Sequence, residues 1–328
     1  MGLMADLKQL GIYTHIHAEL QALETELLEF VATDFSVLHE PSIHLLKAGG
    51  KRLRPAMAFL SAKFYKPDPE KLMFAAMALE LLHMASLVHD DVVDESVTRR
   101  GCPTVKAQWG NIVAIQTGDY LFAKVLELLA KIGDPAISKI LAQATVEMCK
   151  GEIKQIKTVH DTQLSFQQYY YRIKQKTAIL LKASCYLGGI AGGAPKKETW
   201  ALGAYGHALG IAFQISDDIL DITGEASELG KQTGGDIRQG VMTLPMILAL
   251  KLSPRSQELY QILNKQAKSE WDVDLARSLI RESGAIQASG RWVNLFVDKA
   301  MKYLEYLSII KTKQALGELA GFIRIRKW

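Results

Sequence analysis

Apolar residues recur at intervals of three or four along most of this chain. Three segments show the spacing clearly, with apolar positions at Leu20-Leu23-Leu27-Phe30, Met73-Met77-Leu81 and Leu121-Val125-Leu129. Such spacing gathers apolar side chains on one face of an α-helix. Segments in which apolar and polar residues alternate between turn signals, as they do in strands, are nearly absent. The sequence therefore predicts an all-α fold with short connections.

Clusters of proline and glycine mark where the helices are expected to end. They fall at residues 66–69, 133–135, 188–195 and 253–255. The segment from Gly224 to Thr243 differs, because it contains five glycines, Lys231 and Arg238 but no clear apolar stripe, and we interpret it as a mobile lid. No Ser-rich or Pro-rich linker divides the chain, so we expect residues 1–328 to form a single domain.

Charge and cysteine content exclude several classes of function. The 39 basic and 35 acidic residues give a net charge of +4, with no run of five like charges that would suggest a nucleic-acid tail. The three cysteines are far apart and form no Cys-x-x-Cys pair, which favours a reducing, cytoplasmic setting. The most apolar stretch, residues 72–88, is interrupted by Glu80 and His83, so it predicts a buried helix and at most peripheral membrane contact.

One acidic pattern occurs twice. The first acidic pattern is Asp90-Asp91-Val92-Val93-Asp94, and the second is Asp217-Asp218-Ile219-Leu220-Asp221. On a helix, the first and last aspartates of each pattern lie on one face, where like charges repel and burial needs a compensating partner. Oxygen ligands that leave room for water and phosphate suit Mg²⁺. A single copy is more often a solvated helix end, but two copies in apolar contexts favour a diphosphate site with bound metal.

Basic residues that could hold a diphosphate stand in separate segments. They are Gly49-Gly50-Lys51-Arg52-Leu53-Arg54-Pro55, Arg99-Arg100-Gly101 after the first acidic pattern, and Lys174-Gln175-Lys176-Thr177. Glycines let the backbone approach phosphate oxygens, and the cations bind them. His83 shares a helix face with Asp90, although a lone histidine is more often a core residue. Each segment alone is an ordinary surface feature, but together they predict binding groups for two anionic substrates.

These segments resemble the trans-isoprenyl diphosphate synthases, the all-helical class I prenyltransferases. The resemblance runs from about Lys47 to Ala249 and includes Gln214, three residues before Asp217. It implies one large helical bundle around a central cavity. It also implies condensation of an allylic diphosphate, farnesyl or geranyl, with successive isopentenyl diphosphates. The chain looks most like the catalytic large subunits, component II, of bacterial heptaprenyl diphosphate synthases, which implies a heptaprenyl or similar product for a quinone such as menaquinone.

The resemblance also implies a role for each matching residue. Asp90 and Asp94 would bind two Mg²⁺ ions and Asp217 a third, with support from Asp91, Asp218 and Asp221. The groups on the allylic diphosphate and its reacting carbon would be Arg99, Lys176, Thr177, Gln214 and Lys231. The groups on isopentenyl diphosphate would be Lys51, Arg54, His83 and Arg100. Val241 departs from the pattern, because many short-chain relatives have a lysine there, so one phosphate contact of the lid is missing.

Product length is predicted from two small residues. In this family, bulky side chains just before the first acidic pattern form a floor under the growing chain, and Ala85 and Ser86 occupy these positions here. A packed interior has no room for further methylenes once a large side chain blocks it. We therefore expect a product beyond fifteen carbons, with about thirty to forty by resemblance. Close helix packing would also favour small residues at these positions.

Parts of the sequence also fit other functions. A short-chain farnesyl or geranylgeranyl diphosphate synthase keeps the same chemistry. An HD-type phosphohydrolase could use His83 and His89-Asp90, but it leaves the second acidic pattern without a role. A terpene cyclase would replace the second acidic pattern, and a non-catalytic scaffold subunit would have lost several aspartates. For partners we expect a homodimer, or a heterodimer with a small dissimilar subunit.

Overall fold

The computed structural model describes residues 11–224, 233–308 and 311–325, and in these ranges it is built almost entirely of helices. The first half contains α2 (Gly11–Thr14), α3 (His17–Phe30), α4 (Ser36–Lys47), α5 (Leu53–Ala62), α6 (Pro69–Val93), α7 (Val105–Ile132) and α8 (Pro135–Lys157). The second half contains α9 (Phe166–Ile173), the π-helical turn η1 (Lys174–Ala178), α10 (Ile179–Ala191), α11 (Lys196–Thr223), α13 (Gly235–Gln239), α14 (Leu244–Leu252), α15 (Ser256–Leu263), α16 (Glu270–Glu282), α17 (Ala285–Leu304) and α18 (Lys311–Ile325). The predicted all-α fold is confirmed.

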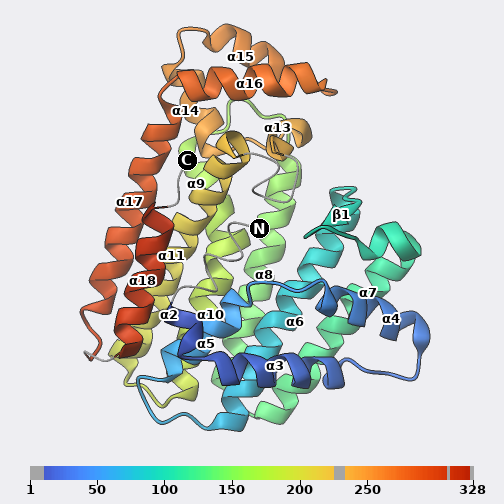
Figure 1. Cartoon of the computed structure of the whole chain (residues 1–328), viewed down its shortest axis with the longest axis vertical. Coiled ribbons are helices and arrows are strands. Elements are labelled where there is room, and N and C mark those ends of the chain that lie inside the picture. The colour runs from blue at the N-terminus through green and yellow to red at the C-terminus, as the bar shows by residue number, and fades with distance from the viewer. Residues whose placement is uncertain (1–10, 225–232, 309–310, 326–328) are drawn as a thin grey trace.

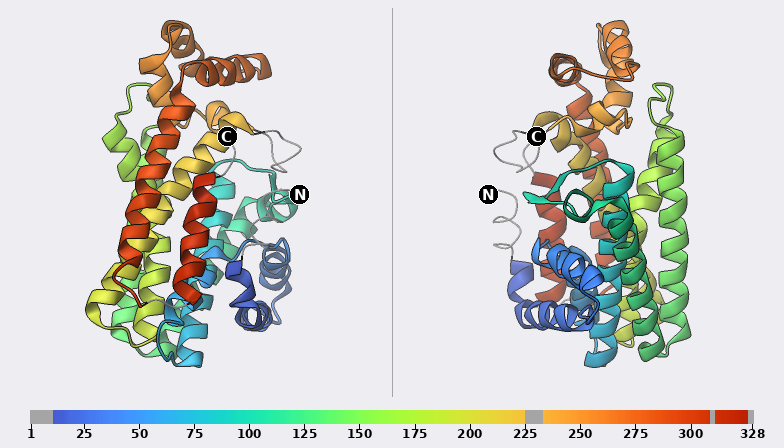
Figure 2. Two further views of the ribbon diagram at one scale, coloured as in Figure 1. Left: turned by 60° about the vertical axis from the view of Figure 1, so that its left-hand side comes forward. Right: turned by 90° about the vertical axis from the view of Figure 1, so that its right-hand side faces the viewer.

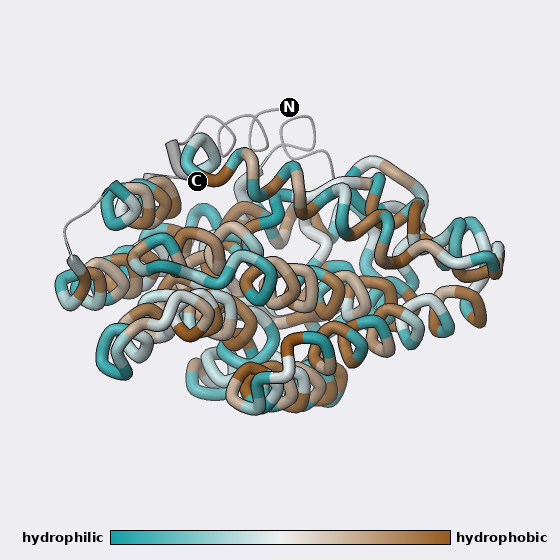
Figure 3. The backbone as a smooth tube through the Cα atoms, turned by 90° about the horizontal axis from the view of Figure 1, so that it is seen from below, coloured by the Kyte–Doolittle hydropathy of each residue, from teal (hydrophilic) through white to brown (hydrophobic). Residues whose placement is uncertain are grey.

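The long helices stand side by side, with short helices at both ends of the bundle. The most extensive pairings join α6 to α7, α10 to α11 and α5, and α11 to α17. Helices α15 and α16 lie across one end, while α3 and α4 lie toward the other (Figure 1), and two further views show the same arrangement (Figure 2). Hydrophobic and hydrophilic residues alternate every few positions along each helix (Figure 3), as expected for helices that bury one face.

Helix starts follow the turn chemistry of the sequence. The side chain of Asp68 accepts hydrogen bonds from the backbone N–H groups of Glu70 and Lys71, and Pro69 opens α6. Asp134 caps α8 in the same way before Pro135. An Asp cap satisfies N–H groups that have no partner within the helix, and proline fits the first helical position. The predicted breaks at 66–69, 133–135 and 253–255 are confirmed.

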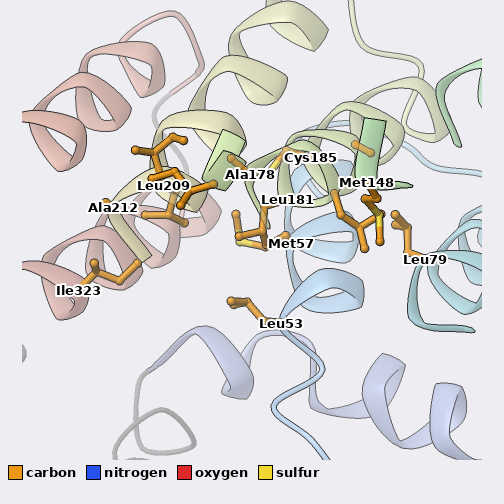
Figure 4. Packing of buried hydrophobic residues seen from close by; sticks show 14 of the residues in the cluster. Leu53, Met57, Leu79, Met148, Ala178, Leu181, Cys185, Leu209, Ala212 and Ile323 are labelled. Atoms are coloured by element: carbon orange, nitrogen blue, oxygen red, sulfur yellow. The ribbon is translucent and has the colours of Figure 1, made fainter. Parts of the chain in front are cut away.

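The predicted break at residues 188–195 is wrong in its first half. Helix α10 continues to Ala191, so Gly188 and Gly189 are helical. A Cβ atom on Gly188 would lie 2.2 Å from the carbonyl oxygen of Ala58 on α5, closer than any real contact. Gly188 therefore permits a close approach of two helices. Figure 4 shows this packed region, where Met57 on α5 lies near Leu181 and Cys185 on α10.

The apolar helix α6 is a core helix. It is long and apolar enough to cross a membrane by length and composition, but 67% of its most apolar window is buried inside the protein. Its buried residues include Leu79, Leu81 and Ala85. The interpretation of residues 72–88 as a buried helix is confirmed.

A small hairpin follows α6. Its strands, β1 (Thr98–Arg99) and β2 (Cys102–Pro103), pair antiparallel and are the only strands in the part of the chain that the structure describes. Arg100 and Gly101 form the turn with positive φ angles of 55° and 79°. Two positive φ angles suit the right-handed twist of a two-residue hairpin, and glycine adopts them at no steric cost.

Candidate active site

Both acidic patterns lie at the C-terminal ends of long helices. The first acidic pattern completes α6, with Asp94 as its C-cap, and the second lies in the last two turns of α11. The C-terminal end of a helix carries a partial negative charge, so aspartates there are electrostatically unfavourable. Ordinary acidic residues at a helix N-terminus, the alternative interpretation of each pattern, are therefore excluded. Both helix ends need a positive partner.

Asp90 lies among charged groups from two other elements. Its carboxylate is 4.0 Å from the Nζ atom of Lys176 on η1, and Nζ is 2.8 Å from Oε2 of Glu152 on α8. Burial raises the pKa of Asp90 to about 7, with a contribution from the Glu152 carboxylate and against the charge of Lys176. The carboxylate is thus partly desolvated and incompletely neutralised. This is the state expected of a carboxylate that binds a further cation.

The second aspartate of the first acidic pattern pairs with the hairpin. Nε and Nη2 of Arg99 both lie 2.8 Å from Oδ1 of Asp91, whose side chain is buried. Burial raises the pKa of Asp91, and the hydrogen bond from Arg99 opposes this rise. Asp91 therefore does not point into open solvent. It fixes Arg99 beside the first acidic pattern.

The second acidic pattern is held by a chain of hydrogen bonds. The Tyr169 hydroxyl donates to Oδ2 of Asp218 at 2.6 Å, and Nε2 of Gln214 donates to Oδ1 at 2.8 Å. Oε1 of Gln214 in turn accepts a hydrogen bond of 2.6 Å from the Thr177 hydroxyl. Burial raises the pKa of Asp218 to about 6, and both hydrogen bonds lower it in part. Asp218 thereby orients Gln214, and Tyr169 is a contributor that the sequence patterns did not reveal.

Asp221 fixes the chain on the far side of the predicted lid. Its carboxylate accepts hydrogen bonds from the backbone N–H groups of Gly235, at 3.3 Å, and Asp236, at 3.1 Å. Arg238, also in that segment, pairs with Glu270 on α16. Residues 225–232, and Lys231 with them, lie outside the described residues. The described part of the predicted lid is thus anchored at its C-terminal side.

These contacts connect the two acidic patterns. Lys176 approaches Asp90, its neighbour Thr177 bonds Gln214, and Gln214 bonds Asp218. Both lysine and threonine belong to η1, and π-helical turns inside α-helices occur often at functional sites. Residues more than a hundred positions apart in the sequence therefore form one continuous site.

A group of basic residues lies beside the first acidic pattern. Burial, together with the positive charges of Arg54 and Arg100, lowers the pKa of His83 well below its usual range. Burial also lowers the pKa of Arg54 to about 10, and burial likewise lowers the pKa of Arg100. The Nε atom of Arg54 is buried without a hydrogen-bond partner among the described residues. Crowded cations with an unsatisfied donor form a site that an anion would stabilise.

The backbone of the Gly-Gly-Lys-Arg segment is held by an ion-pair network that the sequence did not reveal. Arg52 has a positive φ of 44° and only 5% exposure. Its Nη1 atom lies 2.8 Å from Oε1 of buried Glu80, and its other nitrogens bond Glu24. The Tyr13 hydroxyl donates to the carbonyl oxygen of Lys51. Arg52 thus points inward and fixes the turn from which Lys51 extends.

Gly50 lies against the side chain of Arg100. A Cβ atom on Gly50 would lie 2.7 Å from Nη1 of Arg100. The Gly-Gly-Lys-Arg segment and the hairpin are therefore in direct contact, which brings the two predicted groups of isopentenyl diphosphate ligands together.

The donor set fits a metal that completes its shell with other ligands. In residues 11–224, 233–308 and 311–325, no group of three His, Cys, Asp or Glu side chains is arranged to hold a metal alone. Mg²⁺ is usually bound by one or two carboxylates plus substrate phosphates and water. Asp90 and Asp94 at the end of α6, with Asp217 near the end of α11, would supply oxygen ligands of this kind.

His89 lies away from the acidic cluster. Its Nε2 atom is 3.2 Å from the carbonyl oxygen of Ile115 and 3.5 Å from Asp119, both on α7. A Cβ atom on Gly118 would clash with its ring. His89 and Asp90 therefore face different helices, and the phosphohydrolase interpretation is wrong.

The two predicted length-determining residues face different neighbours. Ser86 lies one turn before Asp90 and is partly exposed, with its hydroxyl bonded to the carbonyl oxygen of His83. Ala85 is fully buried and lies one turn before His89, on the side that contacts α7. Ser86 thus shares the acidic face of α6, whereas Ala85 borders the α6–α7 contact.

Several known proteins are similar to this chain in fold and sequence. The family described as polyprenyl synthetase matches residues 35–280. Heptaprenyl diphosphate synthase component 2 of Bacillus subtilis is 41% identical over 98% of this chain and 92% of its own length. Nonaprenyl diphosphate synthase of Mycobacterium tuberculosis is 36% identical over 92% of this chain and 89% of its own. A polyprenyl synthase of Caulobacter crescentus, solved with calcium and isoprenyl diphosphate, superposes with a TM-score of 0.92 and 35% identity, covering 96% of this chain and 97% of that one.

Proposed function

The chain belongs to the polyprenyl synthetase family and is a polyprenyl diphosphate synthase, a prenyltransferase, and from this premise we propose that its product is a long all-trans chain of heptaprenyl or similar length. Similarity to heptaprenyl and nonaprenyl synthases supports this length. Small residues at Ala85 and Ser86 support it independently. We propose a farnesyl or geranyl primer, a quinone side chain as the destination, a cytoplasmic location, and one domain over residues 1–328.

Mg²⁺ is the proposed cofactor, held by Asp90, Asp94 and Asp217, with three ions per site. The desolvated carboxylate of Asp90 and the position of both acidic patterns at negative helix ends support this assignment. The calcium bound by the related Caulobacter enzyme shows that a divalent metal accompanies isoprenyl diphosphate in that protein. Bound metal would neutralise the charge that develops on the departing diphosphate. Around this metal site, Asp91 holds Arg99 and Asp218 holds Gln214. Asp221 holds the backbone at Asp236.

In this proposal, each substrate diphosphate is bound by its own set of residues. Arg99 and Lys176 bind the allylic diphosphate beside Asp90, together with Lys231. Lys51, Arg54, His83 and Arg100 bind isopentenyl diphosphate, where crowded cations and the unpartnered Nε atom of Arg54 favour an anion. His83 is neutral at pH 7 because burial lowers its pKa, so it contributes a hydrogen bond rather than a charge.

The residues between these sets suit the chemical step. The bond between the allylic carbon and the diphosphate oxygen breaks, and the double bond of isopentenyl diphosphate attacks the resulting carbocation. The attack forms the new carbon-carbon bond and leaves a tertiary carbocation on the isopentenyl unit; a proton lost from the neighbouring carbon to the released diphosphate forms the new double bond. Oxygen atoms of Thr177 and Gln214, linked by a 2.6 Å hydrogen bond, would stabilise positive charge at that carbon. Water must be excluded during this step, because it quenches carbocations.

A partner subunit is proposed from the outer faces of α7 and α8. Ile112 and Leu126 on α7 are 80% and 66% exposed, and Ile153 and Ile156 on α8 are 55% and 49% exposed. Exposed apolar side chains that repeat along one face of a helix mark an interaction site more often than isolated ones do. A homodimer, or a heterodimer with a small dissimilar subunit, would cover them. The name of the Bacillus relative, component 2, supports a second component.

The proposal is carried by the hydrogen-bonded connection between the two acidic patterns, and alanine substitutions test it. We expect Asp90→Ala and Asp217→Ala each to lower turnover of isopentenyl diphosphate with Mg²⁺ and farnesyl diphosphate by several orders of magnitude, because metal ions contribute several kcal/mol to the transition state. Radiolabelled isopentenyl diphosphate measures both rate and product length. Asp119→Ala, at an exposed aspartate on α7, is the matched control and keeps its rate. Near-normal turnover in both site variants would contradict the assignment.

A further inference from the structure

A second cavity lies apart from the acidic patterns. It has a volume of about 1170 Å³ between α8, α10, α11 and α17, and none of the predicted site residues lines it. Its apolar and aromatic lining includes Ile140 on α8, Tyr186 on α10, Trp200 on α11, and Phe296 and Tyr303 on α17. Small-molecule sites typically have volumes of about 300–1,000 Å³ and are mostly apolar with a few polar groups. This cavity is large enough for a long chain.

The charges around this cavity are mostly positive. Five lysines line it against one acidic residue, namely Lys139, Lys150, Lys174, Lys182 and Lys299 against Glu147. Glu147 is already engaged, because Lys150 lies 2.7 Å from it and the side chain of Gln175 donates to it. Among the described residues, no other carboxylate lines the cavity to pair with the remaining four lysines. An anion would be attracted to it.

His207 on α11 also lines this cavity, and its Nε2 atom is turned away from the open space. The Nε2 atom of His207 on α11 is inaccessible to solvent and has no hydrogen-bond partner among the described residues. Burial lowers the pKa of His207 to about 4, with help from the charges of Lys182, Lys174 and Lys299. His207 is therefore neutral at pH 7 and keeps an unused hydrogen-bonding position.

The cavity lies behind the catalytic elements. Lys174 lines the cavity, whereas Lys176, two residues later on the same π-helical turn, lies 4.0 Å from Asp90. Helix α11 likewise contributes Trp200 and His207 to the cavity and Gln214 and Asp217 to the proposed catalytic site. A ligand in the cavity would therefore contact the reverse side of the helices that perform the reaction.

We propose that this cavity binds a prenyl diphosphate that has left the catalytic site, with its diphosphate among the lysines and its chain along the aromatic floor. Apolar walls and excess positive charge select an amphiphilic anion, and the enzyme itself produces molecules of that class. The proposal rests on the proposed function for the identity of the ligand. The cavity is distinct from the metal site, so binding there needs no divalent cation.

Calorimetric titration of the full-length protein with geranylgeranyl diphosphate in EDTA tests this proposal. We expect saturable binding without metal. Lys182→Glu/Lys299→Glu should weaken it at least tenfold, because two attractive charges become repulsive. Ala204→Trp should weaken it comparably by filling the cavity while the charge is kept. Lys251→Glu/Lys302→Glu, at exposed lysines outside the cavity, makes the same change in net charge and should bind like the wild type.

Further ligands separate the two parts of the recognition. Geranylgeraniol lacks the anion and inorganic diphosphate lacks the chain, so each should bind at least tenfold more weakly than geranylgeranyl diphosphate. Absence of metal-free binding, or equal affinity in the cavity variants and their control, would overturn the proposal. Equally tight binding of phosphatidylglycerol vesicles through the same lysines would also overturn it, because the site would then recognise a membrane surface.

Turnover of isopentenyl diphosphate with Mg²⁺, measured on the same variants, separates this proposal from the proposed function. Lys182→Glu/Lys299→Glu should retain turnover while it loses metal-free binding. A wild-type protein that does not elongate farnesyl diphosphate would refute the proposed function whatever the calorimetry shows. A wild-type protein that elongates but does not bind in EDTA would refute only the cavity proposal.

Discussion

Asp90 shows how a single residue can favour function over stability. Its carboxylate is held near Glu152 and Asp94, and burial raises its pKa to about 7. A desolvated carboxylate is unfavourable when ionised unless a cation compensates it. The metal-free protein therefore bears a cost at this residue, and a bound cation removes it.

This cost predicts a pH dependence. The pKa of Asp90 is about 7 in the folded protein and about 3.8 when unfolded, so the unfolded state binds fewer protons between these values. The free energy of unfolding of the metal-free protein should thus fall as pH rises from about 4 to 7. Asp90→Asn removes the ionisable group, and we expect it to be more stable than the wild type by about 1–3 kcal/mol at pH 8 and about equal at pH 4. Denaturant unfolding in EDTA measures the difference.

Mg²⁺ with inorganic diphosphate provides the control for this measurement. It should stabilise the wild type at pH 8 and have less effect on Asp90→Asn, because the variant lacks a metal ligand. A variant that is less stable than the wild type at pH 8 in EDTA would show that Asp90 is satisfied by its protein neighbours alone.

At the residue scale, the sequence revealed the charged groups but not those that orient them. The aspartates, Lys176 and Gln214 were predicted from their patterns. Tyr169 and Glu152 were missed, because each acts from a segment without a distinguishing motif and is brought to the site only by packing. Arg52 was predicted as part of a basic segment, but its inward ion pairs with Glu80 and Glu24 were not predicted. A single Tyr, Glu or Arg in a helical segment carries no local signal of a tertiary hydrogen bond. Their roles follow from distances alone.

At the scale of one element, α6 connects chemistry to product length. Its acidic face carries Asp90 and, one turn earlier, the partly exposed Ser86, while Ala85 is fully buried beside α7. Successive helical positions point in different directions, so the two small residues should not be equivalent. A substitution on the acidic face meets the growing chain first.

Large side chains at these two positions test the proposed product length. We expect Ser86→Phe to give a clearly shorter product, because the ring would fill space that the chain needs. Ala85→Phe should also shorten it, but less, and should destabilise the protein by about 1–3 kcal/mol through overpacking against α7. Mass spectrometry of the extracted products measures chain length. Ser86→Ala should keep the wild-type length, and unchanged products in both Phe variants would contradict the role of α6.

The boundaries of elements were predicted well where a capping residue preceded proline and poorly where glycine served packing. Asp68-Pro69 and Asp134-Pro135 combine an N-cap with a residue that suits the first turn. Gly188 has the same identity as a loop glycine, but its role is to let α10 approach the carbonyl oxygen of Ala58. Local sequence cannot separate these two uses of glycine, since the second depends on the partner helix.

At the scale of the whole molecule, the sequence predicted an all-α bundle and two acidic walls, and the structure connects those walls through η1. The existence of a second cavity between α8, α10, α11 and α17 could not be predicted. Its lining comes mainly from these helices, with Tyr170 of α9 and Lys174 of η1, and their lysines and aromatic residues look like parts of ordinary amphipathic faces. Only the relative placement of these elements creates the open cavity between them.

The exposed apolar face of α7 and α8 gives the last prediction. A charge placed at the centre of an apolar interface must be desolvated without a partner, which strongly opposes association. We therefore expect Ile112→Lys and Ile153→Lys each to shift the protein from a dimer, or from its complex with a small subunit, toward the monomer. Sedimentation velocity measures the change.

Leu252→Lys is the matched control for this prediction, because Leu252 is 50% exposed at the end of α14 and does not belong to that face. It should leave the sedimentation coefficient unchanged. If Ile112→Lys and Ile153→Lys sediment like the wild type, the α7 and α8 face is not the interface. A loss of turnover that accompanies dissociation would indicate that the partner helps to shape the site.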